Sequence, residues 1–137
     1  MNDYIVITPV KDEEKYIELT IKSMLKQTIK PLQWAIVDDG SADNTAEIIK
    51  TYAKKYPWIK GVFGKDQGQR ASGVRHIKAF YQGLSALDNK EWDFIIKLDG
   101  DLSFEKDYFE KCFMRFNDNQ KLGIGGGVIL NVLGDKL

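Results

Sequence analysis

The sequence predicts an α/β domain with a doubly wound, mostly parallel sheet sandwiched by helices. Short apolar, β-branched runs alternate along the chain with segments whose apolar residues recur at helical spacing. Polar loops follow several of these runs, as they do at the carboxyl ends of strands in open sheets. The length of 137 residues suffices for one core but not comfortably for two. We therefore expect residues 1–137 to form a single domain.

The first expected strand spans residues 4–8, ends at Pro9 and should be central in the sheet. A helix should follow, with Asp12 or a neighbour as its cap. The second strand, residues 33–37, leads into a sharp turn over residues 38–45. The apolar face of the first helix should contain Tyr16, Ile17, Thr20, Ile21, Met24 and Leu25.

The middle of the chain predicts a helix over residues 46–56, which stops before Pro57. A weaker strand is expected over residues 58–63. Residues 64–73 are polar, glycine-rich and irregular, which suits a binding loop. A further helix is expected over residues 74–87. The face of this helix that packs on the sheet should contain Ile77, Phe80, Tyr81 and Leu84.

The stretch Phe94-Ile95-Ile96-Lys97-Leu98-Asp99-Gly100-Asp101 predicts a buried strand that ends on two carboxylates. A helix over residues 105–117 and a glycine-rich strand over residues 122–132 complete the expected order. The apolar stripe of this last helix contains Tyr108, Phe109, Cys112, Phe113 and Phe116, so Cys112 should be a buried, inert thiol.

Composition excludes some classes of function. Lys plus Arg and Asp plus Glu both number 20, so the formal net charge is zero, which argues against nucleic-acid binding through a broad basic field. The single cysteine allows no internal disulfide and fits a reducing compartment. The N-terminus does not resemble a signal peptide, and no apolar run is long enough to span a bilayer.

Polar loops follow three of the expected strands, at residues 8–12, 38–44 and 99–101. Loops at the carboxyl ends of neighbouring strands meet in one crevice, where ligands bind. Two carboxylates one residue apart suit Mg²⁺ or Mn²⁺, and a diphosphate can complete the coordination shell. The sequence has no glycine-rich phosphate loop, so a metal is expected to hold any phosphates. The alternative is that Asp99-Gly100-Asp101 is only a turn.

The order and spacing of three segments resemble glycosyltransferase family 2. They are Thr-Pro-Val at residues 8–10, Val-Asp-Asp-Gly-Ser-Ala-Asp-Asn-Thr at residues 37–45, and Leu-Asp-Gly-Asp at residues 98–101. The resemblance covers nearly the whole chain but only the donor-binding half of the family. It implies the GT-A fold and an inverting, metal-dependent enzyme of polysaccharide synthesis. Such an enzyme moves a sugar from a nucleoside-diphosphate donor, most commonly UDP-linked, to an acceptor hydroxyl.

The resemblance also implies roles for individual residues. Thr8, Pro9 and Val10 would line the base and ribose site. Either Asp38 or Asp39 would hydrogen-bond the base, and the other would cap the turn.

The remaining implied roles concern the diphosphate end of the donor. Asp99-Gly100-Asp101 would be the family's DXD motif. Within it, Asp101 would ligate Mg²⁺ or Mn²⁺, and Asp99 would lie near the ribose or the metal. Arg70 or Arg75 would contact the base or the phosphates. On residue type alone, Asp43 is expected to be an N-cap, and His76 to have a surface or packing role.

The family's general base is a carboxylate in a later segment, so by this resemblance it lies beyond Leu137 and the catalytic residue is unknown. We expect a donor-binding portion without the acceptor site. Its aromatic helix face could then be exposed and cause self-association. The resemblance implies a saccharide or lipid-linked acceptor and no nucleic-acid partner. It also implies a cytoplasmic location, at the inner face of a membrane in the full-length protein.

Three alternatives remain at this point. A haloacid-dehalogenase-like phosphotransferase would use Asp99 as its nucleophile, although that motif usually follows the first strand. A phospho-receiver domain would use Asp38, Asp39 and Asp99, but its acid pair should also follow the first strand. A non-catalytic nucleotide-binding module would bind the donor without transfer.

Overall fold

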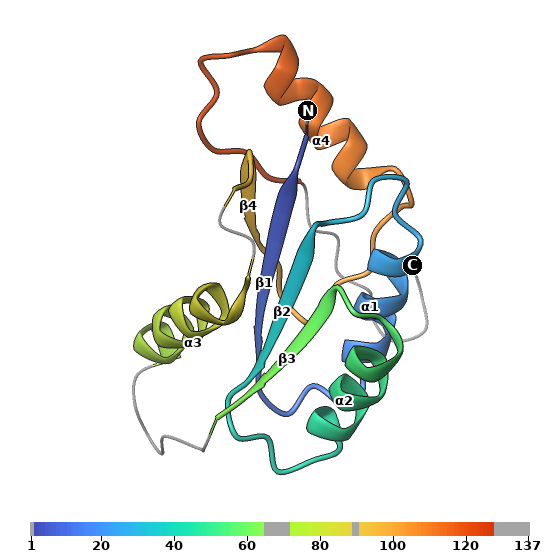
Figure 1. The fold of residues 1–137 in the computed structure, drawn as a ribbon, viewed down its shortest axis with the longest axis vertical. Helices are drawn as coiled ribbons and strands as arrows, with labels where there is room; N and C mark the ends of the chain where they lie inside the picture. Colours follow the sequence, from blue (N-terminus) through green and yellow to red (C-terminus); the bar gives the residue numbers. More distant parts are fainter. Residues whose placement is uncertain (1, 65–71, 89–90, 128–137) are drawn as a thin grey trace.

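The computed structural model describes residues 2–64, 72–88 and 91–127, and within them the fold is a parallel sheet covered by helices on both faces (Figure 1). The strands are β1 (Tyr4–Val10), β2 (Gln33–Asp38), β3 (Ile59–Phe63) and β4 (Phe94–Lys97). The helices are α1 (Ile17–Leu25), α2 (Thr45–Lys55), α3 (Ser72–Ala86) and α4 (Tyr108–Asp118). The strand order is β3-β2-β1-β4, so the predicted fold class and the central position of the first strand are confirmed.

Alternate residues of β1 face the two layers of helices. Tyr4, Val6 and Val10 pack with side chains of α1, α2 and α4 in one cluster. Ile5 and Ile7 pack on the opposite face, under α3. A strand buried on both faces needs apolar residues at nearly every position, and the sequence of β1 has them.

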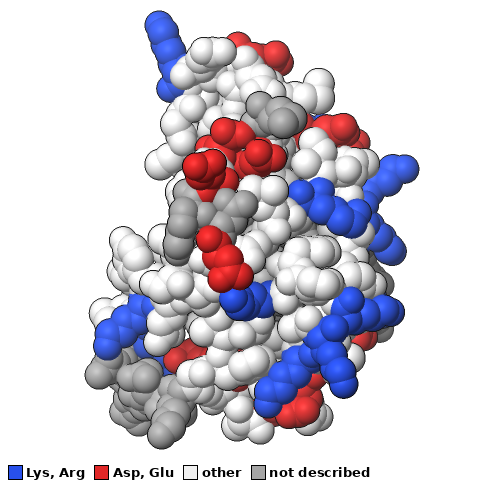
Figure 2. Space-filling model, viewed as in Figure 1, with Lys and Arg blue, Asp and Glu red and all other residues white. Residues whose placement is uncertain are grey.

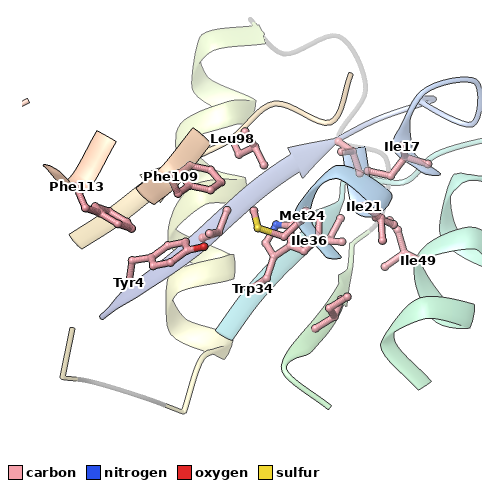
Figure 3. Close-up of a cluster of buried hydrophobic side chains, with 13 residues drawn as sticks. Tyr4, Ile17, Ile21, Met24, Trp34, Ile36, Ile49, Leu98, Phe109 and Phe113 are labelled. Atoms are coloured by element: carbon pink, nitrogen blue, oxygen red, sulfur yellow. The ribbon is translucent and has the colours of Figure 1, made fainter. Parts of the chain in front are cut away.

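Aromatic side chains organise the larger cluster (Figure 3). The Tyr4 ring lies against the rings of Phe109 and Phe113, with centroids 5.4 and 4.9 Å away. Its hydroxyl donates to the carbonyl of Ile29, and burial raises the pKa of the Tyr4 phenol. These contacts join the start of β1 to α4, which follows it by about a hundred residues in the chain.

Helix α3 lies close to the opposite face because Gly83 has no side chain there. A Cβ atom at Gly83 would lie 2.7 Å from Cγ2 of Ile7. The predicted packing face of this helix was partly wrong, because Ile77 and Tyr81 are 60% and 61% exposed. The helix instead turns the small residues Ala79 and Gly83 toward the sheet. Small residues at Ala79 and Gly83 let α3 pack closely on the sheet, and this close packing leaves the larger side chains Ile77 and Tyr81 outside the interface.

Strand β4 is an edge strand of the described sheet and is only half buried. The prediction of a buried strand was therefore wrong, and Ile95 is 37% exposed. β1 extends two residues beyond its predicted end, through Pro9. The carbonyl of Ile7 points toward β4, accepting the N–H of Leu98. The backbone nitrogen of Pro9 points to the same side of β1, beyond the last residue pair of β1 and β4. The missing N–H of Pro9 therefore interrupts no hydrogen bond between these two strands.

Two other predictions differ from the structure. α1 begins at Ile17, and its N-cap residue, Tyr16, makes no capping side-chain hydrogen bond, so neither Asp12 nor a neighbour caps this helix. Within the expected last strand, residues 122–127 have no regular structure and are exposed, and residues 128–132 lie outside the described part. Cys112 is half-buried on α4 rather than fully buried.

The surface carries charges of both signs. On the face shown in Figure 2, basic side chains lie mostly on the side formed by α1 and α2, and acidic side chains form separate groups. None of the helices within the described residues is long and apolar enough to cross a membrane.

Candidate functional site

The carboxyl ends of β2, β1 and β4 lie next to one another in the sheet. Val10 is paired with Asp38 across β1 and β2, and Ile7 is paired with Lys97 across β1 and β4. The polar loops that follow these strands are therefore neighbours, as the sequence predicted. This edge of the sheet is the candidate site.

Reciprocal hydrogen bonds join the loop after β1 to the loop after β2. The Asp12 carboxylate accepts the N–H of Ala42 at 2.7 Å, and the N–H of Asp12 donates to the Ser41 hydroxyl at 2.8 Å. Asp12 adopts a left-handed backbone conformation, with φ of 53°, which aspartate tolerates better than most residues. The side chain that was predicted to cap α1 instead holds the two loops together.

The two neighbouring aspartates after β2 have different surroundings. Asp38 is buried, with 3% exposure, and one of its carboxylate oxygens accepts both the N–H and the hydroxyl of Ser41. Asp39 is partly exposed, and Nε of Arg75 donates to its Oδ2 at 3.0 Å. Asp38 therefore closes the turn, and Asp39 is the more accessible member of the pair.

A pocket of about 200 Å³ opens beside this ion pair. Arg75, His76 and Ala79 reach it from one face of α3, since residues three and four apart on a helix are neighbours. Its lining residues are Pro9, Val10, Lys11, Asp39, Arg75, His76 and Ala79. The pocket combines an apolar wall with a carboxylate and a guanidinium, a composition typical of small-molecule sites.

Thr8 does not line this pocket. Its side chain is buried, and its hydroxyl accepts the indole N–H of Trp34 at 2.8 Å. Thr8 thus joins two strands within the core. Pro9 and Val10, the other two residues of the same predicted segment, do line the pocket.

The Asp99-Gly100-Asp101 segment lies tightly against the end of β1. A Cβ atom at Gly100 would lie 2.4 Å from Cγ1 of Val10 and 3.3 Å from Cδ1 of Ile17. The glycine therefore lets this backbone pass close to β1 while the two flanking aspartates stay exposed. Asp99 accepts a hydrogen bond from the ammonium of Lys97 at 3.0 Å.

Negative charge accumulates between the loop after β1 and the loop after β4. Partial burial raises the pKa of Glu13, and the charges of Asp101, Asp43, Asp99 and Asp12 raise it further. Asp101 is the largest of these electrostatic contributions. Glu13 therefore lies within electrostatic reach of both aspartates of the predicted metal motif.

The N-cap residue of α2 is Asn44, which makes no capping side-chain hydrogen bond, so the prediction that Asp43 is the N-cap was wrong by one position. Asp43 lies just before it and still bonds to the first residue of the helix. Its Oδ1 accepts the N–H of Thr45 at 2.9 Å, and its Oδ2 accepts the N–H of Glu14 at 3.2 Å. Slight desolvation favours the neutral acid, but the hydrogen bonds from Thr45 and Glu14 outweigh it and lower the pKa of Asp43. This carboxylate is used to hold the loops together.

The described residues contain no group of three or more His, Cys, Asp or Glu side chains arranged to hold a metal ion. Asp99 and Asp101 supply hard oxygen donors that suit Mg²⁺ or Mn²⁺. Mg²⁺ is commonly held by one or two carboxylates together with substrate phosphates and water. The donor set therefore fits a cation that arrives with a diphosphate.

Sequence reasoning found some of these residues and missed others. His76 is exposed, as expected, but it also lines the pocket, and Lys11 was not predicted there. No sequence signal distinguishes these two side chains from ordinary surface residues. Arg70 lies outside the described residues.

Known structures share this fold. The crystal structure of S. aureus TarS residues 1–349 superposes with a TM-score of 0.67 and 24% sequence identity. The match covers 86% of this chain and 33% of the TarS chain. The shared fold confirms the GT-A architecture that was expected from the sequence.

Curated relatives are glycosyltransferases. Chondroitin synthase of Escherichia coli is 29% identical over 120 residues, which are 85% of this chain and 16% of that protein. Cholesterol galactosyltransferase of Borreliella burgdorferi is 31% identical over 99 residues, which are 72% of this chain and 25% of that protein. The chain thus spans a quarter or less of the length of these relatives. The family model of glycosyl transferase family 2 matches residues 5–135, and the chain belongs to this family.

Proposed function

We propose that this chain forms the donor-binding domain of an inverting glycosyltransferase that uses a nucleoside-diphosphate sugar and Mg²⁺ or Mn²⁺. The observation that carries this proposal is the position of the Asp39–Arg75 pocket and the Asp99-Gly100-Asp101 segment at one edge of the sheet. One offers a place for a base, and the other offers ligands for a diphosphate-bound cation. TarS, which shares the fold, has been crystallised with UDP and with UDP-GlcNAc, which supports this choice of donor.

The chemistry of Asp39 favours some bases over others. A carboxylate only accepts hydrogen bonds, so it pairs with the N3–H of uracil or thymine or the N1–H of guanine. Cytosine presents an unprotonated nitrogen at the equivalent position, and a carboxylate repels it. Arg75 donates to Asp39 through Nε and so fixes the orientation of the carboxylate that would meet the base. We infer that a uridine nucleotide is the donor and that cytidine nucleotides bind poorly.

Asp101 and Asp99 would hold the divalent cation beside the diphosphate. A bound cation there would neutralise the charge that builds on the departing nucleoside diphosphate. The protein's own part is to place these carboxylates correctly. The negative charge that surrounds Glu13 supports this assignment, because a cation would relieve the repulsion.

The acceptor and the general base are proposals for the whole protein. We place the base outside residues 1–137, where it would deprotonate the acceptor hydroxyl for attack on the anomeric carbon. A saccharide acceptor is supported by the similarity to chondroitin synthase. Membership of the family favours sugar transfer over the phosphotransferase and receiver alternatives.

The experiment that tests the donor site is a thermal-shift titration with UDP, GDP, CDP and dTDP, each with and without Mn²⁺. A ligand that binds only the folded state adds about 2.7 kcal/mol of stability at a hundredfold excess over its Kd. We expect the largest shift with UDP and Mn²⁺. Asp101→Asn should remove the part of the shift that depends on Mn²⁺, and Asp39→Asn should weaken UDP and uridine alike.

Asp118→Asn is the matched control, because Asp118 is an exposed aspartate at the end of α4. Its neighbour Asn117 bonds to Asn2, near the amino end of β1 and so away from the site at the carboxyl ends of the strands. A UDP shift that is the same in wild type and Asp101→Asn would contradict the metal assignment. Donor binding by the full-length protein without sugar transfer would instead favour the alternative of a non-catalytic nucleotide-binding module.

A further inference from the structure

Three polar side chains on one side of α1 receive the backbone that follows Asp101. Thr20, Ser23 and Gln27 are spaced three and four residues apart, so they lie in a row along the helix and just beyond its end. We call this row the α1 rail. α1 otherwise buries apolar residues, so a polar row on it needs a specific explanation.

Successive side chains of the α1 rail bond to successive backbone groups of the segment after Asp101. The hydroxyl of Thr20 accepts the N–H of Leu102 at 3.0 Å, and the hydroxyl of Ser23 accepts the N–H of Phe104 at 3.3 Å. The Gln27 side chain accepts the N–H of Phe109 at 3.2 Å and donates to the carbonyl of Glu105 at 2.7 Å.

Asp101 therefore lies between two anchored residues. On one side, Gly100 is packed so closely against β1 that no Cβ atom would fit. On the other side, the N–H of Leu102 is held by Thr20, which is fully buried. The Asp101 backbone is thus fixed at both ends although its carboxylate is exposed.

We propose that Thr20 is a positioning residue for Asp101: its buried hydroxyl holds the Leu102 amide and so sets where the Asp101 carboxylate meets a divalent cation bound to a nucleoside diphosphate. This inference rests on the proposed function, in which Asp101 ligates that cation. Groups that orient a metal ligand commonly change metal affinity by about 10- to 100-fold when they are removed. Thr20 acts through the backbone and touches neither metal nor substrate.

The test compares Thr20→Val, Thr20→Ser and wild type. Valine keeps the shape of threonine but removes the acceptor, whereas serine keeps the hydroxyl. The quantity to measure is the ratio of UDP affinities with and without saturating Mn²⁺, at a temperature where every variant is folded. We expect Thr20→Val to lower this ratio by about tenfold and to leave UDP affinity without metal unchanged. Thr20→Ser should restore the wild-type ratio.

Ser23→Ala is the matched control, because it removes the same kind of bond two residues further from Asp101. It should lower stability but change the ratio much less than Thr20→Val. A Thr20→Val ratio equal to that of wild type overturns the inference. A lowered ratio in Thr20→Ser as well also overturns it, because packing rather than the hydroxyl would then be responsible.

Asp101→Asn separates this inference from the proposed function. If Mn²⁺ does not strengthen UDP binding in wild type, the metal site is wrong and the positioning role is wrong with it. If the Mn²⁺ effect is lost in Asp101→Asn but kept in Thr20→Val, only the positioning role is wrong. Should Thr20→Val not fold, amide exchange in wild type decides. A protected Leu102 N–H that Mn²⁺ and UDP protect further supports the inference, and exchange at the unprotected rate overturns it.

Discussion

Replacing Gly100 with alanine tests whether close packing against β1 shapes the candidate metal segment. The new Cβ atom would lie 2.4 Å from Cγ1 of Val10, whereas carbon atoms pack without strain at about 3.5–4.0 Å. The overlap therefore exceeds 1 Å, and the backbone or Val10 must move. Gly100 does not have a positive φ, so the effect is steric and not conformational.

Overpacking of this kind costs about 1–3 kcal/mol of unfolding free energy. The neighbour that clashes is a short, β-branched side chain on a central strand, which favours the upper part of that range. Val10→Ala removes the clashing atom and should itself cost about 2 kcal/mol through lost burial and a cavity. In that background, Gly100→Ala should be less costly by about 1–2 kcal/mol.

The assay is urea denaturation of the two single variants, the double variant and wild type, with Mn²⁺-dependent UDP binding measured in parallel. Gly73→Ala is the control, because a Cβ atom at that position has nothing within 4 Å and should be neutral or slightly stabilising. Additive costs in the double variant, or a Gly100→Ala protein as stable as wild type, would refute the reasoning.

Three further predictions concern the loops. Burial and the neighbouring acids raise the pKa of Glu13, so the ionised side chain destabilises the folded state at neutral pH. Glu13→Gln should therefore stabilise the fold at pH 7.5, and this gain in stability should disappear below the ordinary carboxyl pKa of 4.5, where Glu13 is protonated in both states. Thermal melts across this pH range measure the difference. Asp43→Ala removes the acceptor of the Thr45 and Glu14 N–H groups and should cost about 1 kcal/mol, by urea denaturation. Thr8→Val leaves the buried Trp34 N–H unpaired and should lower the unfolding free energy by about 1–3 kcal/mol, measured by urea denaturation. The Kd for UDP, measured by calorimetry, should stay unchanged.

Each of these predictions has an outcome that contradicts it. For Glu13, the contradiction is a gain that persists unchanged at pH 3, and Glu47→Gln on the exposed face of α2 is the control. For Asp43, it is an Asp43→Ala protein of unchanged stability. For Thr8, it is a loss of UDP affinity in the folded variant, which would return Thr8 to the nucleotide site.

The order of strands and helices could be predicted from the sequence because it depends on local periodicity. Within residues 2–64, 72–88 and 91–127, each of the four strands and four helices overlaps an element expected from apolar spacing. The element ends were less predictable. The capping role expected of Asp12 failed because its carboxylate bonds to Ala42, thirty residues further along the chain. Ile77 and Tyr81 were misplaced because small residues on α3 decide its approach to the sheet.

By itself, the sequence determined the fold class, the family pattern and the three polar loops at the ends of strands, since residue type and spacing carry that information. Only the tertiary structure decided that Asp38 is buried while Asp39 pairs with Arg75. It also decided that Thr8 belongs to the core and that Thr20 holds the segment after Asp101. These assignments depend on contacts between residues 26 to 82 positions apart, and no local pattern specifies such contacts.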